Sequence, residues 1–321
     1  MIMDKNKKSS MRSAYGKALV EVGKLNPNVV ALDADVSCST QSQIFAKEFP
    51  ERFFNMGIAE QDMVATAAGL ASQGKIPFAS AFAIFATGRT YDQIRNSICY
   101  PEFNVKIVGT HGGITVGEDG ASHQALEDVA LMRGLPNMTV IVPADSKECQ
   151  EVIKYAASHS GPMYIRVARS NVPDIFGEDY KFDINKAQVL RQGADVTIVT
   201  NGETLAEVIE CADILEKSGI HAQIIHLPVV KPLDSATILE EVAKTNFVVT
   251  VENHSIIGGI GSAICEILSE KMPTKVLRIG TNDEFGQSGD ATELMDFYGL
   301  TAEKIAEKIA KKIETKLKEI K

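Results

Sequence analysis

The sequence has few cysteines, and none of them lies near another. Five occur among 321 residues, and the closest two, Cys99 and Cys149, are 50 positions apart. Zinc sites and disulfide-linked small domains place their cysteine or histidine ligands within a few positions of one another. We therefore expect reduced, mostly buried thiols, no metal site in this chain and a cytoplasmic location.

Long hydrophobic runs and an excess of basic residues are also absent. No segment approaches the ~18 consecutive apolar residues of a membrane span. No apolar segment follows the lysine-rich first eight residues, as it would in a secretory signal. The 33 basic and 42 acidic side chains give a net charge of −9, whereas nucleic-acid-binding proteins carry strongly basic surfaces. We expect no nucleic-acid or membrane partner, although a local arginine pocket for a phosphorylated small molecule is compatible with this charge.

The first half of the chain alternates short hydrophobic runs with segments of helical length. A chain of this length that is 45% hydrophobic can form about two domains. The small residues of 59–73 predict a helix that ends at Gly74. The predicted strands are 28–33, 76–82, 105–108, 139–142 and 163–167. Strands separated by helices form a mostly parallel sheet covered on both faces, so we predict a doubly wound α/β domain over residues 1–172.

A second alternating unit follows a polar segment. Residues 173–192 contain a proline, a glycine and clustered charges, which predict an irregular linker. Beyond it, the pattern predicts a smaller α/β domain over residues 193–321, with strands at 196–199, 222–225 and 247–251 and a helix at 205–218. Residues 301–321 predict an amphipathic helix that docks on this domain through an apolar stripe. The stripe comprises Ile305, Ile309, Ile313, Leu317 and Ile320.

Glu60 stands where an apolar stretch turns into the helix predicted at 59–73. A glutamate at this place can simply be favoured by the helix dipole, which contributes roughly 0.3–1 kcal/mol. In an apolar cleft, by contrast, desolvation favours the protonated carboxyl group, which can then share its proton with a heterocyclic nitrogen. Burial of the side chain distinguishes the two interpretations.

Phe82 and Phe85 lie at the end of a predicted strand, shortly before Gly88. Neighbouring aromatic side chains most often belong to a hydrophobic core. The alternative is a flat apolar clamp for an aromatic ring of a ligand.

A stretch from His111 to Gln124 directly follows another predicted strand and contains two histidines and two acidic residues among four glycines. In a doubly wound sheet this position is the carboxyl edge, where ligands bind, so we interpret the stretch as functional rather than as a structural turn. Arg169 ends a further strand, and Arg12 lies near the start of the first helix. Either arginine is a candidate for bidentate phosphate binding or an ordinary surface charge.

The segment 258–263 has some likeness to a dinucleotide-binding fingerprint. It lacks the third glycine at the required spacing, and a long loop separates it from the preceding strand. We interpret it as packing between a loop and a helix.

These segments occur in the order found in transketolases, and from about Arg12 to near its end the chain resembles the C-terminal half of a transketolase. The most specific part is Gly-Glu-Asp-Gly-Ala-Ser-His-Gln at 117–124. The resemblance implies a pyrimidine-binding domain followed by the small transketolase C-terminal domain. It also implies thiamine diphosphate as the cofactor and transfer of a two-carbon ketol unit between sugar phosphates.

The resemblance also implies roles for individual residues. Glu60 matches the glutamate that contacts a ring nitrogen of the cofactor's aminopyrimidine and so promotes removal of the thiazolium proton. Asp35 matches an aspartate near the cofactor, and the aromatics that stack on the pyrimidine match Phe82 and Phe85. The positions that hold the sugar phosphate match Arg12, Ser39, His111 and Arg169. The positions that read the sugar hydroxyls and help to move protons match Asp119 and His123.

One motif of the family is missing from this sequence. Transketolases hold the diphosphate and its Mg²⁺ with Gly-Asp-Gly and an asparagine about 25–30 residues later, and no Gly-Asp-Gly occurs here. Because the family's cofactor lies between the diphosphate-binding domain of one protomer and the pyrimidine-binding domain of another, this chain would supply one wall of the site. We expect one subunit of a split enzyme, inactive alone and completed by an N-terminal subunit that holds Mg²⁺, in a two-plus-two heterotetramer.

Departures from the family pattern leave the sugar substrate open. Ala59-Glu60-Gln61 differs from the Arg-Glu-His of long transketolases and resembles 1-deoxyxylulose-5-phosphate synthase, and Gly88 replaces a third aromatic. A second hypothesis is the beta subunit of a thiamine-dependent 2-oxo acid dehydrogenase, which has similar length and domain order. A third is a non-catalytic paralogue that acts as a scaffold. The paired histidines and the arginines favour a sugar phosphate, and we expect an exposed apolar face where the partner docks.

Overall fold

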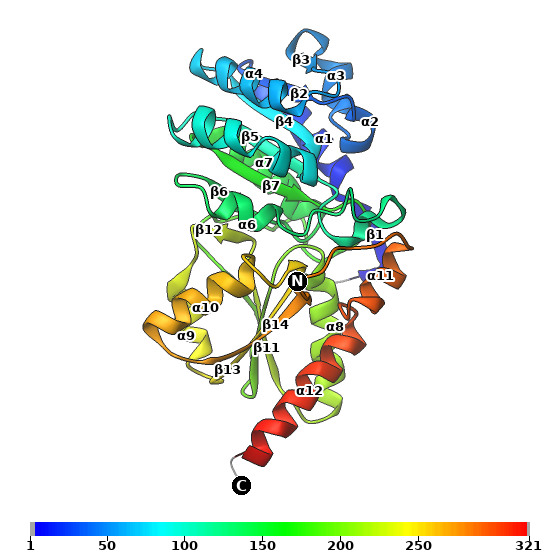
Figure 1. The fold of residues 1–321 in the computed structure, drawn as a ribbon, viewed down its shortest axis with the longest axis vertical. Helices are drawn as coiled ribbons and strands as arrows, with labels where there is room; N and C mark the ends of the chain where they lie inside the picture. The colour runs from blue at the N-terminus through cyan, green and yellow to red at the C-terminus, as the bar shows by residue number, and fades with distance from the viewer. Residues whose placement is uncertain (1–3, 320–321) are drawn as a thin grey trace.

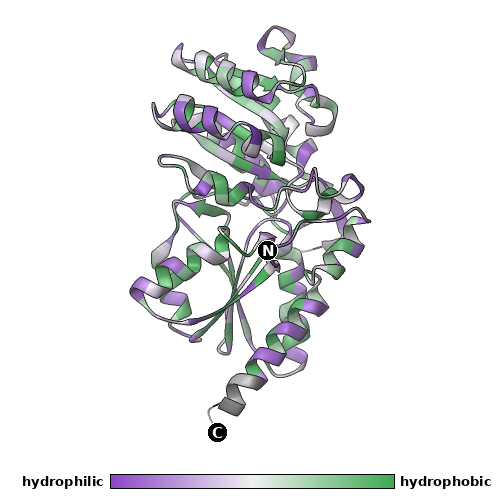
Figure 2. Cartoon of the chain, viewed as in Figure 1, coloured by the Kyte–Doolittle hydropathy of each residue, from purple (hydrophilic) through white to green (hydrophobic). Residues whose placement is uncertain are grey.

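The computed structural model describes residues 4–319, which form two α/β units stacked along the long axis of the molecule (Figure 1). Within these residues the strands form a seven-stranded, a five-stranded and a two-stranded sheet. Apolar strands run through the inside of each unit, and the polar faces of the helices lie outside (Figure 2). The α/β class expected from the alternating sequence pattern is confirmed.

The seven-stranded sheet has the order β12-β6-β7-β5-β4-β2-β3. Its strands are β2 (Val29–Asp33), β3 (Phe53–Asn55), β4 (Ile76–Phe82), β5 (Lys106–Thr110), β6 (Thr139–Ile141), β7 (Met163–Val167) and β12 (Val229–Lys231). The pairs are parallel except the one between β12 and β6. β12 comes from the second half of the chain, and Val229 and Val230 are buried there. The first sheet is therefore completed by a strand that the sequence pattern did not predict.

Helices cover both faces of this sheet. Along β2, Val29 and Ala31 pack on the cluster that contains residues of α1 (Met11–Leu25) and α7 (Ser146–Ser158). Val30 and Leu32 pack on the cluster that contains residues of α4 (Glu60–Ser72). Alternate residues of one strand thus face two different cores, as expected of a parallel sheet. The helical segments are α1 (Met11–Leu25), α2 (Ser37–Thr40), α3 (Gln43–Glu48), η1 (Pro50–Arg52), α4 (Glu60–Ser72), the π-helix η2 (Phe85–Arg89), α5 (Tyr91–Gln93), the π-helix η3 (Ile94–Cys99), the 3-10 segment η4 (Ile114–Asp119), α6 (Asp128–Arg133) and α7 (Ser146–Ser158).

The five-stranded sheet has the order β14-β13-β10-β11-β9. Its parallel strands are β10 (Val196–Thr200), β11 (Ala222–His226), β13 (Phe247–Ser255) and β14 (Lys275–Thr281), and β9 (Gln188–Arg191) is an antiparallel edge. Its helices are α8 (Thr204–Lys217), α9 (Ser235–Val242), α10 (Ile260–Lys271), α11 (Ala291–Phe297) and α12 (Ala302–Glu319).

The segment 173–192 is not irregular throughout. It begins inside β8 (Asn171–Asp174), which pairs with β1 (Asp4–Ser10), and it ends in β9. Ile175 and Phe176 are buried against the second unit, and the Asp145 side chain accepts hydrogen bonds from both of their backbone N–H groups. Two buried apolar side chains and a buried carboxylate therefore pack this connection closely, despite its polar composition.

The last helix docks as the apolar stripe predicted. Ile305 and Ile309 are fully buried, and Ile313 packs against the same cluster. The side chain of Leu317 and all of Ile320 lie outside the described part of the chain. No helix within residues 4–319 has the length and hydrophobicity to cross a membrane.

Candidate active site

The topology gathers the candidate residues at one edge of the seven-stranded sheet. The strands β7, β5, β4 and β2 are parallel neighbours, so their carboxyl ends meet. Phe82 is the last residue of β4, and His111 directly follows β5. Arg169 and Asp35 lie two residues beyond the ends of β7 and β2. This edge is where ligands bind in open parallel sheets.

Two phenylalanines and two histidines form an aromatic cluster at this edge. The ring of His111 stacks on Phe82, with 4.0 Å between the centroids. Phe82 and Phe85 are 6.1 Å apart and nearly parallel, and His123 meets Phe85 edge-on at 5.2 Å. Phe82 and Phe85 are both only partly buried. Two phenylalanine rings with accessible surface are compatible with a clamp for a flat ligand rather than with a closed core.

Glu60 is the first residue of α4 and is 4% exposed. Of the two interpretations of Glu60, this burial favours a carboxyl group in a cleft over a surface glutamate at a helix start. The surroundings are nevertheless not purely apolar, because Arg89 Nη1 donates a 2.8 Å hydrogen bond to Glu60 Oε2. The guanidinium group of Arg89 also lies 4.5 Å from the ring centroid of Phe85. Arg89 was not predicted from the sequence.

Arg12 and Arg169 supply positive charge beside the aromatic cluster. Arg12 Nη1 donates to the backbone carbonyl of Ser39 at 2.8 Å, and its buried Nε has no hydrogen-bond partner among the described residues. Burial, and then the nearby charge of Arg169, lower the pKa of Arg12. Within residues 4–319, the ion pair of Arg169 is with the exposed Glu118 alone, at 3.2 Å. A crowded pair of guanidinium groups with an unused donor suits an anion such as a phosphate.

His111 is uncharged at neutral pH. Burial, and then the charges of Arg12, Arg169 and His123, lower its pKa to about 3. Its Nδ1 lies 2.8 Å from Thr110 Oγ1. The backbone of His111 is in the left-handed region with φ 60°, a conformation that is costly for a residue with a side chain. A neutral imidazole can donate to or accept from a ligand without adding charge.

The second unit holds the loop that follows His111. The side chain of Asn253 in β13 accepts from Ile114 N at 3.0 Å and donates to Thr115 Oγ1 and to Glu203 Oε1. It lies directly over Gly113, where φ is +81° and a Cβ atom would be 2.4 Å from the Asn253 amide. Sequence reasoning missed these hydrogen bonds because they join residues 50 to 139 positions apart.

The remaining candidates lie nearby in less enclosed positions. Asp35 is exposed, has a left-handed backbone with φ 64° and accepts from Asn55 Nδ2 at 3.1 Å. Asp119 is exposed, and none of the contacts within residues 4–319 joins it to the other candidates. Ser39 contributes its carbonyl group to Arg12.

The glycine-rich segment at 258–263 packs a helix end, as the sequence predicted. The buried carboxylate of Glu252 accepts from Ile260 N and Gly261 N at the start of α10, at 2.8 and 2.9 Å. A Cβ atom on Gly259 would be 1.9 Å from Glu252 Oε2. The protein's own carboxylate thus occupies the helix end at which a dinucleotide phosphate would bind.

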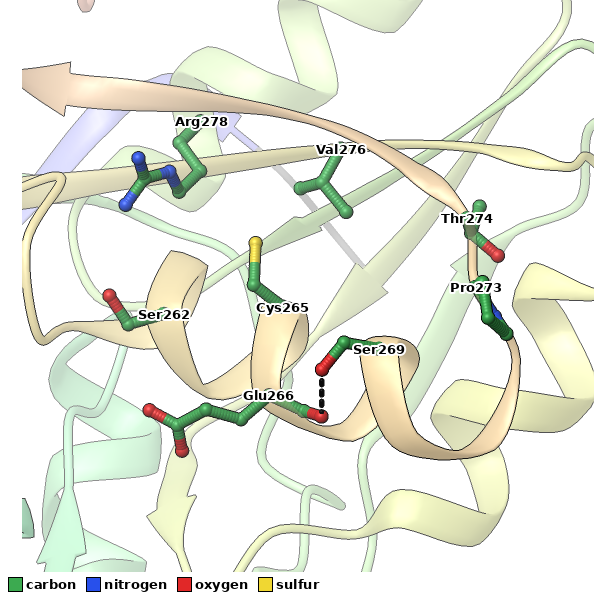
Figure 3. Close-up of a pocket in the computed structure, with 8 residues that line it drawn as sticks. All are labelled: Ser262, Cys265, Glu266, Ser269, Pro273, Thr274, Val276 and Arg278. Atoms are coloured by element: carbon green, nitrogen blue, oxygen red, sulfur yellow. Dashed lines mark hydrogen bonds between the residues drawn. The ribbon is translucent and has the colours of Figure 1, made fainter.

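A cavity of about 660 Å³ lies between α10 and β14, and none of the candidate site residues lines it (Figure 3). Its polar groups bind within the protein: Arg278 donates to the Ile256 carbonyl, and Ser269 donates to that of Glu266. Among residues 4–319, no group of three or more histidine, cysteine or acidic side chains is placed to hold a metal ion. The five cysteines are unpaired, and three of them are buried.

Comparison with known proteins defines the class. Residues 7–174 match the family of the transketolase pyrimidine-binding domain, and residues 185–305 match the family of the transketolase C-terminal domain. The chain therefore belongs to the transketolase family, as the sequence motifs indicated. Family membership implies dependence on thiamine diphosphate. A buried glutamate that Arg89 joins to the partly exposed Phe85 ring fits the pyrimidine of that cofactor.

Some of its relatives are a C-terminal section and a subunit of similar length. It is 52% identical over 301 residues, 92% of this chain and 94% of the other, to a Methanocaldococcus jannaschii protein that carries the name transketolase C-terminal section. It is 40% identical to a 6-deoxy-6-sulfo-D-fructose transketolase subunit of Clostridium sp. strain MSTE9, over 95% of both chains. A solved structure described as a split-gene transketolase, inactive beta4 tetramer, superposes with a TM-score of 0.88 at 51% identity and covers 95% of this chain and 98% of that one.

Proposed function

We propose that the chain is the C-terminal subunit of a split transketolase that moves a two-carbon ketol unit from a ketose phosphate to an aldose phosphate. In this proposal it is active only in a two-plus-two complex with an N-terminal subunit that holds the diphosphate and Mg²⁺. The names of the relatives support a divided enzyme, and the inactive tetramer of the split-gene transketolase supports dependence on a partner. Ile58, two residues before Glu60, is 81% exposed and would be covered by that partner. The reduced cysteines support a cytoplasmic location.

Bound thiamine diphosphate would supply the electron sink that the transfer of a carbon unit needs. Glu60 would hold a proton at a nitrogen of the pyrimidine ring, and Phe82 and Phe85 would orient that ring and exclude water from it. Asp35, at the end of β2, would lie at the rim of the same cleft. The burial of Glu60, which Arg89 joins to the Phe85 ring, is the observation that carries the proposal.

The arginines would bind the sugar phosphate. Among the described residues, Arg12 Nε has no hydrogen-bond partner and Arg169 has an ion pair with an exposed glutamate alone. His111, neutral by virtue of its low pKa of about 3, would donate a hydrogen bond to the same phosphate. Ser39 lies beside Arg12. His123 and Asp119, on the loop above the rings, would bind the sugar hydroxyls and move protons.

Co-purification with the N-terminal subunit, followed by assays of the complex, tests this function. We expect ketol transfer from a ketose phosphate that requires thiamine diphosphate, Mg²⁺ and both subunits. Turnover by the chain alone would contradict the dependence on a partner. Decarboxylation of pyruvate without ketol transfer would instead identify the beta subunit of a 2-oxo acid dehydrogenase.

A further inference from the structure

Arg89 connects two groups of the proposed cofactor site. Its Nη1 donates to Glu60 Oε2 at 2.8 Å, and its guanidinium carbon lies 4.5 Å from the ring centroid of Phe85. A guanidinium group over an aromatic face gains cation–π attraction. The Arg89 side chain therefore contacts both the buried carboxylate of Glu60 and the ring of Phe85, two groups that we propose bind the cofactor.

The backbone around Arg89 is held firmly. Arg89 is the last residue of the π-helix η2, and its carbonyl accepts from Gln61 Nε2 at 3.0 Å. On either side of it, Thr87 Oγ1 and Thr90 Oγ1 donate to carbonyls one turn earlier, both at 2.7 Å. Single π-turns inside helices occur often at functional sites. The guanidinium group is thus presented to Glu60 from a well-ordered segment.

The charges of the pair are unequally buried. The Glu60 side chain is 5% exposed, whereas that of Arg89 is 47% exposed. A buried carboxylate without a partner is strongly unfavourable, whereas the arginine can reach water if the pair breaks. Arg89 binds one carboxylate oxygen of Glu60, and no contact within residues 4–319 uses the other, Oε1.

We propose that Arg89 is a positioning residue for Glu60: it holds Oε2 and so leaves Oε1 oriented for a hydrogen bond with the pyrimidine of the cofactor. This inference rests on the proposed function. It assigns the arginine no contact with the reacting atoms. Its effect on catalysis passes through the orientation of one carboxyl group.

The first test uses thermal unfolding of the chain alone. Arg89→Met should lower Tm by about 2–4 °C, because a buried carboxylate loses its counter-charge. Glu60→Gln in the same chain should restore most of this loss, because a neutral amide does not need a cation. The matched control is Arg95→Met, since Arg95 is exposed and its guanidinium group bonds only the Asn96 side chain in the part of the chain that the structure describes. Additive effects of the two substitutions would overturn the proposed coupling.

The second test measures thiamine diphosphate affinity of the complex with the N-terminal subunit by calorimetry. Arg89→Met should weaken binding about tenfold, and Arg89→Lys, which keeps a cationic donor, should recover most of that loss. Arg95→Met should bind like the wild type. Unchanged affinity in Arg89→Met would overturn the inference, and so would tighter binding, since the arginine would then compete with the cofactor for Glu60. Failure of the wild-type complex to bind the cofactor would instead contradict the proposed function.

Discussion

Replacement of His111 by glutamine tests the electrostatics of the site. Burial, followed by the charges of Arg12, Arg169 and His123, lowers the pKa of His111 from 6.5 to about 3. Between pH 6.5 and about pH 3, His111 is therefore protonated in the unfolded chain but neutral in the folded chain. Stability must fall as the pH falls through this window. From pH 7.5 to pH 5 the loss amounts to about 2 kcal/mol from this residue alone.

Equilibrium denaturation of the wild type and His111→Gln at pH 7.5 and pH 5 measures this contribution. The variant should lose about 2 kcal/mol less than the wild type on acidification. His159→Gln provides a matched control, because His159 is exposed. A titration that follows the ring protons of His111 measures its pKa directly. Inorganic phosphate bound beside the two arginines should raise this pKa. Equal acid sensitivity of the wild type and His111→Gln would refute the reasoning.

Three further substitutions test the contacts that support the site. Asn253→Ala should destabilise the chain by about 1–3 kcal/mol and speed amide exchange in the loop after His111, because the half-buried Glu203 loses a donor and Ile114 N loses its acceptor; unchanged exchange would contradict this. Tyr180→Phe removes a hydrogen bond to the buried carboxylate of Glu148 and should lower the unfolding free energy by about 1.5–3 kcal/mol. Tyr100→Phe is the control, because Tyr100 is exposed, and an equally small effect of both substitutions would contradict this. Gly112→Ala would place a Cβ atom 2.3 Å from Nε of Arg166, which donates to buried Asp128. The backbone next to His111 must then shift, so weaker phosphate binding is expected in titrations, and unaltered affinity would count against it.

The secondary structure was predictable because its signals are local. The strand β4 was predicted with its observed bounds, Ile76–Phe82, and the helix predicted over 59–73 is α4, Glu60–Ser72. β12 was not predicted, because it has only three residues and belongs to the sheet of the other half. The burial of Phe176 was not predicted, because the surrounding segment is rich in charged residues and has no regular apolar pattern.

The edge of the site was predictable, but its electrostatics were not. The alternation of strands and helices places Phe82, His111 and Arg169 at the carboxyl ends of neighbouring strands whatever the details of packing. The pairing of Glu60 with Arg89 depends on the course of a π-helix 29 positions later. No local sequence pattern specifies that course. The support of the histidine loop by Asn253 likewise depends on how the two units meet.

The rate of ketol transfer by the two-subunit complex carrying Glu60→Ala is the most direct test of the whole account. In the proposed chemistry this carboxyl group holds a proton at the pyrimidine nitrogen, so the complex should lose at least about a hundredfold in rate while it still assembles normally. A rate equal to that of the wild-type complex would contradict the account and would favour a subunit that serves only as a scaffold.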